Sequence, residues 1–423
     1  MSPTAIPLTQ KDRSPMYVYV VATLDTKGTE AALVRDLLVT QGVPTKLVDT
    51  GCLGTPQVPA DITREQVFEA AGTSLATMLA QGDRGEAVSR AAQGAARLIE
   101  RFHTQGQVAG VIGLGGGAGT TIGTTAMRAL PVGVPKLMLS TMASGQVRSY
   151  VAGRDIMMLY SVVDILGINR ISRLVLSNAA HAMAGMVKCA RPRAAGPERP
   201  IVAATMFGVT TPCVERAREV LEAAGYEVLV FHATGVGGET MEGLIRDGLI
   251  AGVLDITTTE LADELVGGML SAGAQRLTAA GAMGVPQVVS VGATDMVNFY
   301  EPKSVPAPFQ QRKLYRHNPN VTLMRTTAEE NARIGADIGR KLAQATGPRA
   351  ILLPRQGVSA LDRCGQPFDD PPAREALFAA IRAAAAGVEI LELDCHLNDR
   401  VFAETAATKL LDMMRSETSR SLV

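Results

Sequence analysis

The chain has 423 residues with 41 basic (Lys plus Arg) and 41 acidic side chains, so its formal net charge is zero. This length exceeds one ordinary hydrophobic core and predicts two or three domains. The balanced charge, without a long basic run, argues against a nucleic-acid partner bound through a basic face. No apolar stretch is long enough to cross a bilayer, so we expect no membrane partner.

Hydrophobic content of 47% with 42 glycines and no tryptophan is typical of an α/β protein with many glycine-bearing turns. The first fifteen residues are polar, contain prolines and lack an apolar signal region, so we expect a loose tail. The five cysteines are scattered without a C-x-x-C pair and indicate reduced thiols rather than structural zinc: Cys52, Cys189, Cys213, Cys364 and Cys395. We therefore expect a cytoplasmic protein.

The beginning of the chain predicts a βαβ unit. A strand over 16–24 is followed by a helix over 29–40 and a second strand over 45–48. The loops after both strands are expected at the carboxyl edge of a parallel sheet, where ligands bind. In the first of these loops, Lys27 could reach a phosphate, although a solvated turn lysine is the simpler alternative. Asp25 could hold Mg²⁺ or cap the next helix.

We expect residues 54–104 to form a helical insertion. The glycine-rich segment that follows this insertion is the strongest functional signal in the sequence. The apolar run 108–114 predicts a buried strand that breaks into Gly115, Gly116, Gly117 and Gly119. Thr120 or Thr121 can then cap a helix, so amide donors and a positive helix end converge on one point, which favours a phosphate. The alternative is a tight turn that needs glycines only for packing.

The glycine segment does not match a single nucleotide motif. Gly113-x-Gly115-x-x-Ala118 satisfies the dinucleotide fingerprint, but no acidic residue follows at the spacing that holds a ribose. No Gly-Lys-Ser/Thr closes a P-loop either. The next predicted strand, over 134–140, ends in a small-residue loop that brings Thr141 and Ser144 to the same edge. Helical patterns over 164–188 and a proline-containing linker over 190–200 close this half.

The second half repeats the landmarks of the first. The strand at 202–206 echoes that at 20–24, and Ala251-Gly252-Val253 matches Ala109-Gly110-Val111. Val285-Pro286 likewise matches Val134-Pro135 before the next strand. The fold class we predict is therefore α/β, with two similar doubly wound (Rossmann-like) parallel-sheet domains that face each other across a cleft. We expect a nucleotide-binding domain over 16–190 and a second α/β domain over 200–423.

The loops of the second half carry candidate acid–base groups. Asp255 and Glu260 flank a run of three threonines and could act as acid and base, or serve only as helix caps. His232 and His396 lie in polar loops and could join them in proton transfer, although isolated loop histidines are more often structural. We assign these four residues as catalytic candidates and assign no metal site.

Long ordered motifs resemble one known family. Val21 to Gly28, Gly113 to Gly119, Phe231 to Gly238, Asp255 to Glu260, Asp295 to Phe299 and His396 to Asn398 are similar to the Tm-1-like ATP-binding family (UPF0261). The resemblance implies two α/β domains, ATP binding in the first and a homodimer. In a plant antiviral member, the homologous region binds ATP, inhibits a viral helicase and precedes a TIM-barrel-like domain. For this chain, such a TIM-barrel partner would be a separate protein.

The function we predict is an ATP-binding enzyme of small-molecule metabolism, with Mg²⁺ as the accompanying ion. A carboxylic or sugar acid would bind in the cleft between the halves, near His232, Asp255 and Arg312. The alternative is a non-catalytic module that binds a protein partner under nucleotide control. The residues expected to hold the nucleotide are Asp25, Lys27, Gly113, Gly115, Gly116, Gly117, Gly119, Thr120, Thr121, Thr141 and Ser144.

Overall fold

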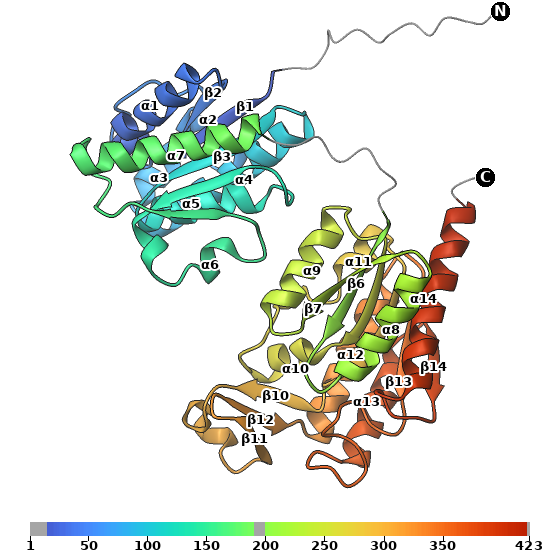
Figure 1. The fold of residues 1–423 in the computed structure, drawn as a ribbon. Coiled ribbons are helices and arrows are strands. Elements are labelled where there is room, and N and C mark those ends of the chain that lie inside the picture. The colour runs from blue at the N-terminus through green and yellow to red at the C-terminus, as the bar shows by residue number, and fades with distance from the viewer. Residues whose placement is uncertain (1–14, 190–198, 421–423) are drawn as a thin grey trace, which may run out of the picture. The chain divides into compact units, whose positions relative to one another are not determined.

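The computed structural model describes residues 15–189 and 199–420. The chain divides into two compact units, one within residues 1–195 and one within residues 196–423, and each is described by itself (Figure 1). Residues 190–198 of the expected linker lie outside the described residues. Within the described ranges, no helix is both long and apolar enough to cross a membrane.

The first unit is built on a five-stranded parallel sheet with the strand order β2-β1-β3-β4-β5. From β1 the chain first winds outward to β2, then returns to β3 on the other side of β1 and continues to β5. The strand order therefore reverses between β1 and β3, where doubly wound sheets bind ligands. The strands are β1 (Tyr17–Ala22), β2 (Thr45–Asp49), β3 (Val108–Gly115), β4 (Lys136–Ser140) and β5 (Met157–Tyr160).

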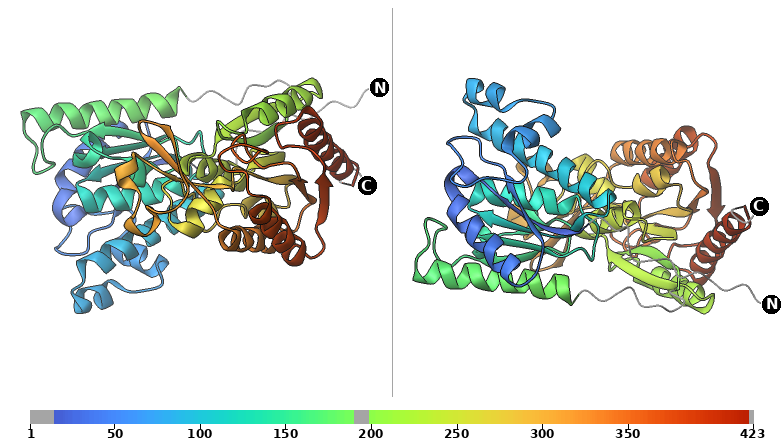
Figure 2. Two further views of the ribbon diagram at one scale, coloured as in Figure 1. Left: turned by 90° about the horizontal axis from the view of Figure 1, so that it is seen from below. Right: turned by 90° about the horizontal axis from the view of Figure 1, so that it is seen from above.

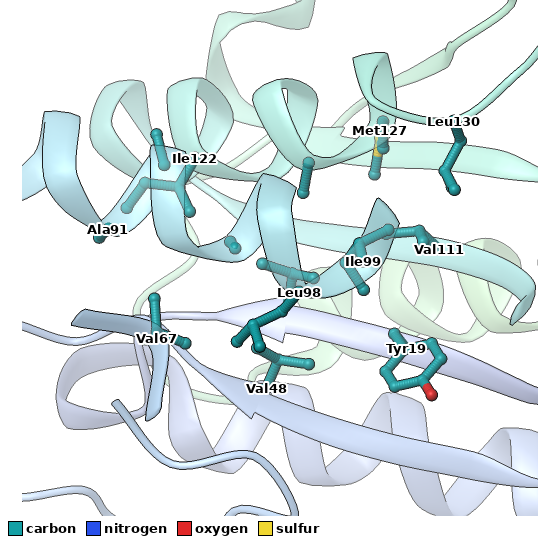
Figure 3. Close-up of a cluster of buried hydrophobic side chains, with 14 of the residues drawn as sticks. Tyr19, Val48, Val67, Ala91, Leu98, Ile99, Val111, Ile122, Met127 and Leu130 are labelled. Atoms are coloured by element: carbon teal, nitrogen blue, oxygen red, sulfur yellow. The ribbon is translucent and has the colours of Figure 1, made fainter. Parts of the chain in front are cut away.

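Helices cover both faces of this sheet (Figure 2). One face packs against α1 (Leu24–Thr40) and α7 (Arg170–Lys188), and the other against α4 (Arg84–Thr104) and α5 (Gly117–Arg128). Figure 3 shows Leu98 and Ile99 of α4 in the core that also holds residues of α5 and the sheet. The shorter helices are α2 (Arg64–Ala70), α3 (Leu75–Gln81), η1 (Thr141–Ser144) and α6 (Arg148–Val151).

The second unit contains a six-stranded parallel sheet with the order β7-β6-β8-β9-β13-β14. Its strands are β6 (Ile201–Met206), β7 (Glu227–His232), β8 (Gly252–Thr257), β9 (Gln287–Gly292), β13 (Arg349–Pro354) and β14 (Glu389–Leu393). One face is covered by α8 (Thr211–Ala223) and α14 (Arg400–Arg420). The other is covered by α9 (Val236–Arg246), α10 (Thr259–Val266), α11 (Ala279–Met283), α12 (Ala328–Ala343) and α13 (Pro371–Ala384).

The two units share their winding, which confirms the predicted pair of doubly wound domains. In both sheets the second strand lies beside the first, and the third lies on its other side. The repeated Val-Pro landmark has the same bond in each unit, because Val111 N donates to Pro135 O and Val253 N to Pro286 O, both at 2.9 Å. The cleft between the domains stays a prediction.

Three local features differ from the expectation. Helix α5 begins at Gly117 with Gly116 as its N-cap, so the predicted cap at Thr120 or Thr121 is wrong. The edge strand β5 has no counterpart among the predicted strands. The second unit also carries a separate antiparallel sheet that the sequence reading missed, formed by β10 (Met296–Phe299), β11 (Leu314–Asn318) and β12 (Val321–Arg325), with η2 (Pro302–Ser304) and η3 (Ala307–Phe309) between them.

Candidate functional site

A cavity of about 240 Å³ opens at the carboxyl ends of β1, β2 and β3 in the first unit. This is the point at which the strand order reverses, the expected ligand position in a doubly wound sheet. Its lining comes from the residues at and after the ends of these strands, from the first turn of α1, from α4 and α5, and from the loop before α7: Thr23, Asp25, Thr26, Lys27, Cys52, Leu53, Arg84, Val88, Gly115, Gly116, Gly117, Ala118, Gly119, Ile122 and Asp164.

The glycines of this loop fall into two groups. A Cβ on Gly115 would lie 2.8 Å from the Cα of Gly119, and one on Gly113 would lie 2.5 Å from the sulfur of Met138. These glycines allow strand and helix to pack closely. In contrast, a Cβ on Gly117 would meet no atom within 4 Å, and the N-cap Gly116 has no side chain to bond the first-turn amides. Gly116 and Gly117 therefore expose bare backbone to the cavity.

The predicted hydroxyl ligands are engaged mainly with the protein. Thr120 is buried, and its hydroxyl bonds Gly116 O at 2.7 Å and Ser140 Oγ at 2.6 Å. The Thr121 hydroxyl donates to Gly117 O at 3.0 Å. Thr141 and Ser144 lie in η1 after β4 and are not among the cavity-lining residues. Ligand binding by these four residues, and by Gly113, stays a prediction that the geometry does not favour.

Charged side chains of both signs line the cavity. Lys27 and Arg84 form no side-chain ion pair or hydrogen bond with the described residues. Lys27 has non-helical backbone angles (φ −130°, ψ 19°), which interrupt the first turn of α1. Asp25 Oδ2 accepts the amides of Leu53 and Gly54, each at 3.0 Å. The other oxygen of Asp25 is buried and has no hydrogen-bond partner in the described chain.

In the second unit, Asp255 and Glu260 are bound to a buried arginine. Arg276 is fully buried and holds Asp255 through two bonds of 2.5 and 2.7 Å, while its Nε donates to Glu260 at 2.6 Å. The surrounding carboxylates raise the pKa of Arg276 well above its ordinary value, so the guanidinium stays charged. A third carboxylate, Glu242, lies 3.5 Å from Arg276. The Thr205 hydroxyl donates to Asp255 at 2.6 Å. Asp255 and Glu260 are 1% exposed or less, an arrangement typical of a structural ion group.

Glu260 also closes the second glycine loop. Its Oε1 accepts the amides of Gly235 at 2.7 Å and Gly238 at 3.1 Å, at the N-terminus of α9. A Cβ on Gly238 would lie 2.1 Å from the Glu260 carboxylate, and one on Gly237 would lie 1.9 Å from His232 O. The Glu260 carboxylate therefore fills the space at this second glycine loop, whereas the first unit has an open cavity at its glycine loop.

The two histidines have different environments. His396 is 1% exposed, its Nε2 donates to Ser359 O at 2.8 Å, and its Nδ1 accepts the Asn398 amide at 3.0 Å. Burial lowers its pKa, so the ring is neutral and fully bonded. His232 is exposed at the end of β7 and packs edge-on against Phe207, with ring centroids 5.3 Å apart. Partial burial lowers its pKa as well.

The catalytic candidates do share one parallel sheet, as their loops require, but no hydrogen bond among the described residues joins them. His232 is the last residue of β7 and His396 follows β14, and these strands lie at opposite edges of the sheet. The acid-substrate candidate Arg312 is also occupied, since it pairs with Glu330 at 2.8 Å. No group of three or more potential metal-ligating side chains occurs in the described residues. Joint catalysis stays a prediction without a contact to support it.

A second buried carboxyl cluster in this unit was not among the assigned site residues, although Asp295 belongs to a motif that carries the family resemblance. Asp295 accepts the Ser359 hydroxyl at 2.8 Å through one oxygen, and its other oxygen has no partner among the described residues. Asp362 lies in the same cluster and bonds Arg325 at 3.2 Å and Arg374 at 2.9 Å. Burial, with the nearby charge of Asp362, raises the pKa of Asp295 to about 7. The cluster is enclosed and stabilises the loops after β9 and β13.

The sequence reading also missed Arg84 and Asp164 in the cavity. A signal for Arg84 was present, because Asp83 is a favourable N-cap and Glu86 stands at the third helical position. That pattern predicts a helix start at Arg84, next to the sheet edge. Arg276 had no comparable signal, since its three carboxylate partners are distant in sequence.

Comparisons with known proteins cover nearly the whole chain. A UPF0261 protein of Clostridium tetani is 48% identical over 399 residues, which span 94% of this chain and 98% of that protein. A UPF0261 protein of Rhizobium meliloti is 47% identical over the same shares of the two chains. The ToMV resistance protein Tm-1(GCR237) of Solanum lycopersicum is 44% identical over 78% of this chain and 45% of its own length. Residues 16–192 match the N-terminal domain, and residues 199–414 the C-terminal domain, of Uncharacterised protein family UPF0261, to which this chain therefore belongs.

Proposed function

We propose that the first unit binds a phosphate-bearing ligand, with ATP as the leading candidate, in the cavity at the carboxyl ends of β1, β2 and β3. The observation that carries the proposal is the bare backbone of Gly116 and Gly117 beside two unpaired cations, Lys27 and Arg84. Amides at an uncapped helix start and a nearby ammonium group are the donors that a phosphate requires. Close packing alone explains why glycine is needed at 113, 115 and 119. It does not explain the glycine at 117, where a Cβ would meet no protein atom within 4 Å.

Mg²⁺ fits the same cavity. Mg²⁺ usually takes one or two carboxylates together with the phosphates of its ligand. Asp25 and Asp164 both line the cavity, and the unpartnered oxygen of Asp25 has no other role among the described residues. These two carboxylates are therefore the groups we assign to the ion that accompanies the nucleotide.

The test is Gly117→Val, which places a side chain where the backbone is bare. Gly185→Val is the matched control, because a Cβ on Gly185 of α7 also meets no atom within 4 Å and lies away from the cavity. With Mg²⁺ and ATP at about 100 times Kd, the native protein gains about 2.7 kcal/mol of stability. We expect the melting shift to vanish in Gly117→Val and to persist in Gly185→Val. An unchanged shift in Gly117→Val contradicts the assignment.

The binding-module alternative gains support from the second unit. Asp255, Glu260 and His396, which favoured an enzyme, are buried and hydrogen-bonded. We therefore propose nucleotide binding as the primary activity and treat turnover of a carboxylic or sugar acid as a separate question. ATP consumption by the purified protein in the presence of such acids supports the enzyme, and binding without consumption supports the module.

A further inference from the structure

The shared winding of the two units allows a residue-by-residue comparison at their third strands. Val111 and Val253 donate the same bond to the proline before the next strand. Six residues later, α5 begins at Gly117 and α10 begins at Thr259. The next position is Ala118 in the first unit and Glu260 in the second.

In the second unit this position holds an anion supplied by the protein itself. The Glu260 carboxylate accepts two amides at the N-terminus of α9 and pairs with Arg276. The first unit has only the methyl group of Ala118, which lines the cavity. The cavity of the first unit therefore lies at the position that the Glu260 carboxylate occupies in the second unit.

The cation on this side of the cavity is Arg84. It is the first residue of α4, the helix that directly precedes the third strand, as α9 does in the other unit. The third amide of α4 is already bonded at 3.0 Å by the Asp83 side chain and is not available to a ligand, whereas Arg84 itself lines the cavity. Helix α4 is rigidly anchored, since its residues pack with α5 and the sheet (Figure 3).

We infer, on the basis of the proposed function, that Arg84 binds a second phosphate next to Ala118 and makes the site selective for ligands with two or more linked phosphates. One phosphate lies on Gly116, Gly117 and Lys27, and the next reaches the guanidinium. Arginine suits this role because its planar fork binds phosphate through two donors. A nucleoside monophosphate leaves Arg84 unused.

Binding of four probes tests the selectivity: inorganic phosphate, pyrophosphate, AMP and ATP, each with Mg²⁺. We expect Arg84→Ala to lower the affinity for pyrophosphate and ATP at least tenfold and that for AMP and phosphate less than twofold. Arg90→Ala is the control on the same helix, since Arg90 pairs with Glu86 and does not line the cavity. An equal loss for all four probes overturns the inference but leaves phosphate binding intact. If the native protein binds none of them, the proposed function itself fails.

A ligand-free experiment tests the internal comparison. Ala118→Glu supplies the carboxylate that the second unit carries, and we expect it to abolish ATP binding and to raise the melting temperature of the ligand-free protein. The rise should disappear in the Ala118→Glu/Arg84→Ala double variant, because the new carboxylate then lacks its cation. Ala118→Gln is the neutral control of similar size and should give no rise. A rise that is unchanged without Arg84, or no rise at all, overturns the inference.

Discussion

Removal of the buried guanidinium of Arg276 tests whether Asp255 and Glu260 form a structural ion group. Arg276→Met keeps an unbranched but shorter side chain, leaves Asp255 and Glu260 without their cation and removes the 3.5 Å contact to Glu242. Asp255 then loses two bonds, of 2.5 and 2.7 Å, and Glu260 loses one of 2.6 Å, in a site where Arg276 and Glu260 are fully buried.

The expected cost follows from that burial. Breaking a buried ion pair by removing one partner costs about 3–5 kcal/mol, because the remaining charge is uncompensated. We expect a loss of this size in the free energy of unfolding of the second unit, measured by urea denaturation. The first unit, including its response to ATP, should be unaffected, since Arg276 belongs to the other unit.

A compensated variant separates charge from shape. In Arg276→Met/Asp255→Asn/Glu260→Gln, positions 255 and 260 are neutral, while Gly235 and Gly238 still find an oxygen at position 260. The remaining carboxylate, Glu242, keeps the backbone amides of Leu277 and Ala279 as donors. Neutral replacement of buried ion partners is often tolerated. We expect the triple variant to recover at least half of the lost stability. A loss below about 1 kcal/mol in Arg276→Met would refute the structural reading and return the two carboxylates to catalysis.

Two further predictions concern pH and assembly. Burial raises the pKa of both Asp263 and Asp295 to about 7 from 3.8, so the folded state binds more protons than the unfolded state between these values. The contribution of these two groups to the stability of the second unit should be largest near pH 4 and be lost as the pH rises through 7. Asp295→Asn should flatten the slope of unfolding free energy against pH, and an identical slope in that variant counts against the reasoning. The homodimer implied by family resemblance predicts a light-scattering mass above the monomer value of 44.4 kDa, and a monomer mass at micromolar concentration would refute it.

Much of the fold was predictable because each strand carries a local signal. Apolar β-branched runs such as 108–114 are typical of buried parallel strands, and a glycine or polar turn marks the end of each. The same landmarks recur in the same order in the two halves, and this repeat predicted the pair of doubly wound sheets. Strand β5 was not predicted because it is only four residues long and partly exposed. It also lacks the alternation of apolar and polar residues that is typical of a half-buried strand.

The site was only partly predictable, because sequence patterns do not show burial or distant partners. Asp255 and Glu260 follow a strand end, as a catalytic or ligand-binding carboxylate would, and only the structure shows Arg276 between them. The helix start at Gly117 was misplaced for a related reason. Threonine is the better N-cap by propensity, but Thr120 uses its hydroxyl within the helix and toward Ser140. Tertiary contacts decided both cases.

The divergence of the two units also limits where chemistry can occur. In the second unit the position of Glu260 is filled, and the protein's own charges satisfy one another. In the first unit the matching position is open, and the cations beside it, Lys27 and Arg84, have no ion pair in the described chain. If ATP is consumed, the reacting groups are therefore to be sought among the residues of this cavity, with Asp25 and Asp164 as its carboxylates. His232→Ala probes the remaining exposed candidate of the second unit, and unchanged consumption in that variant would confine the chemistry to the first.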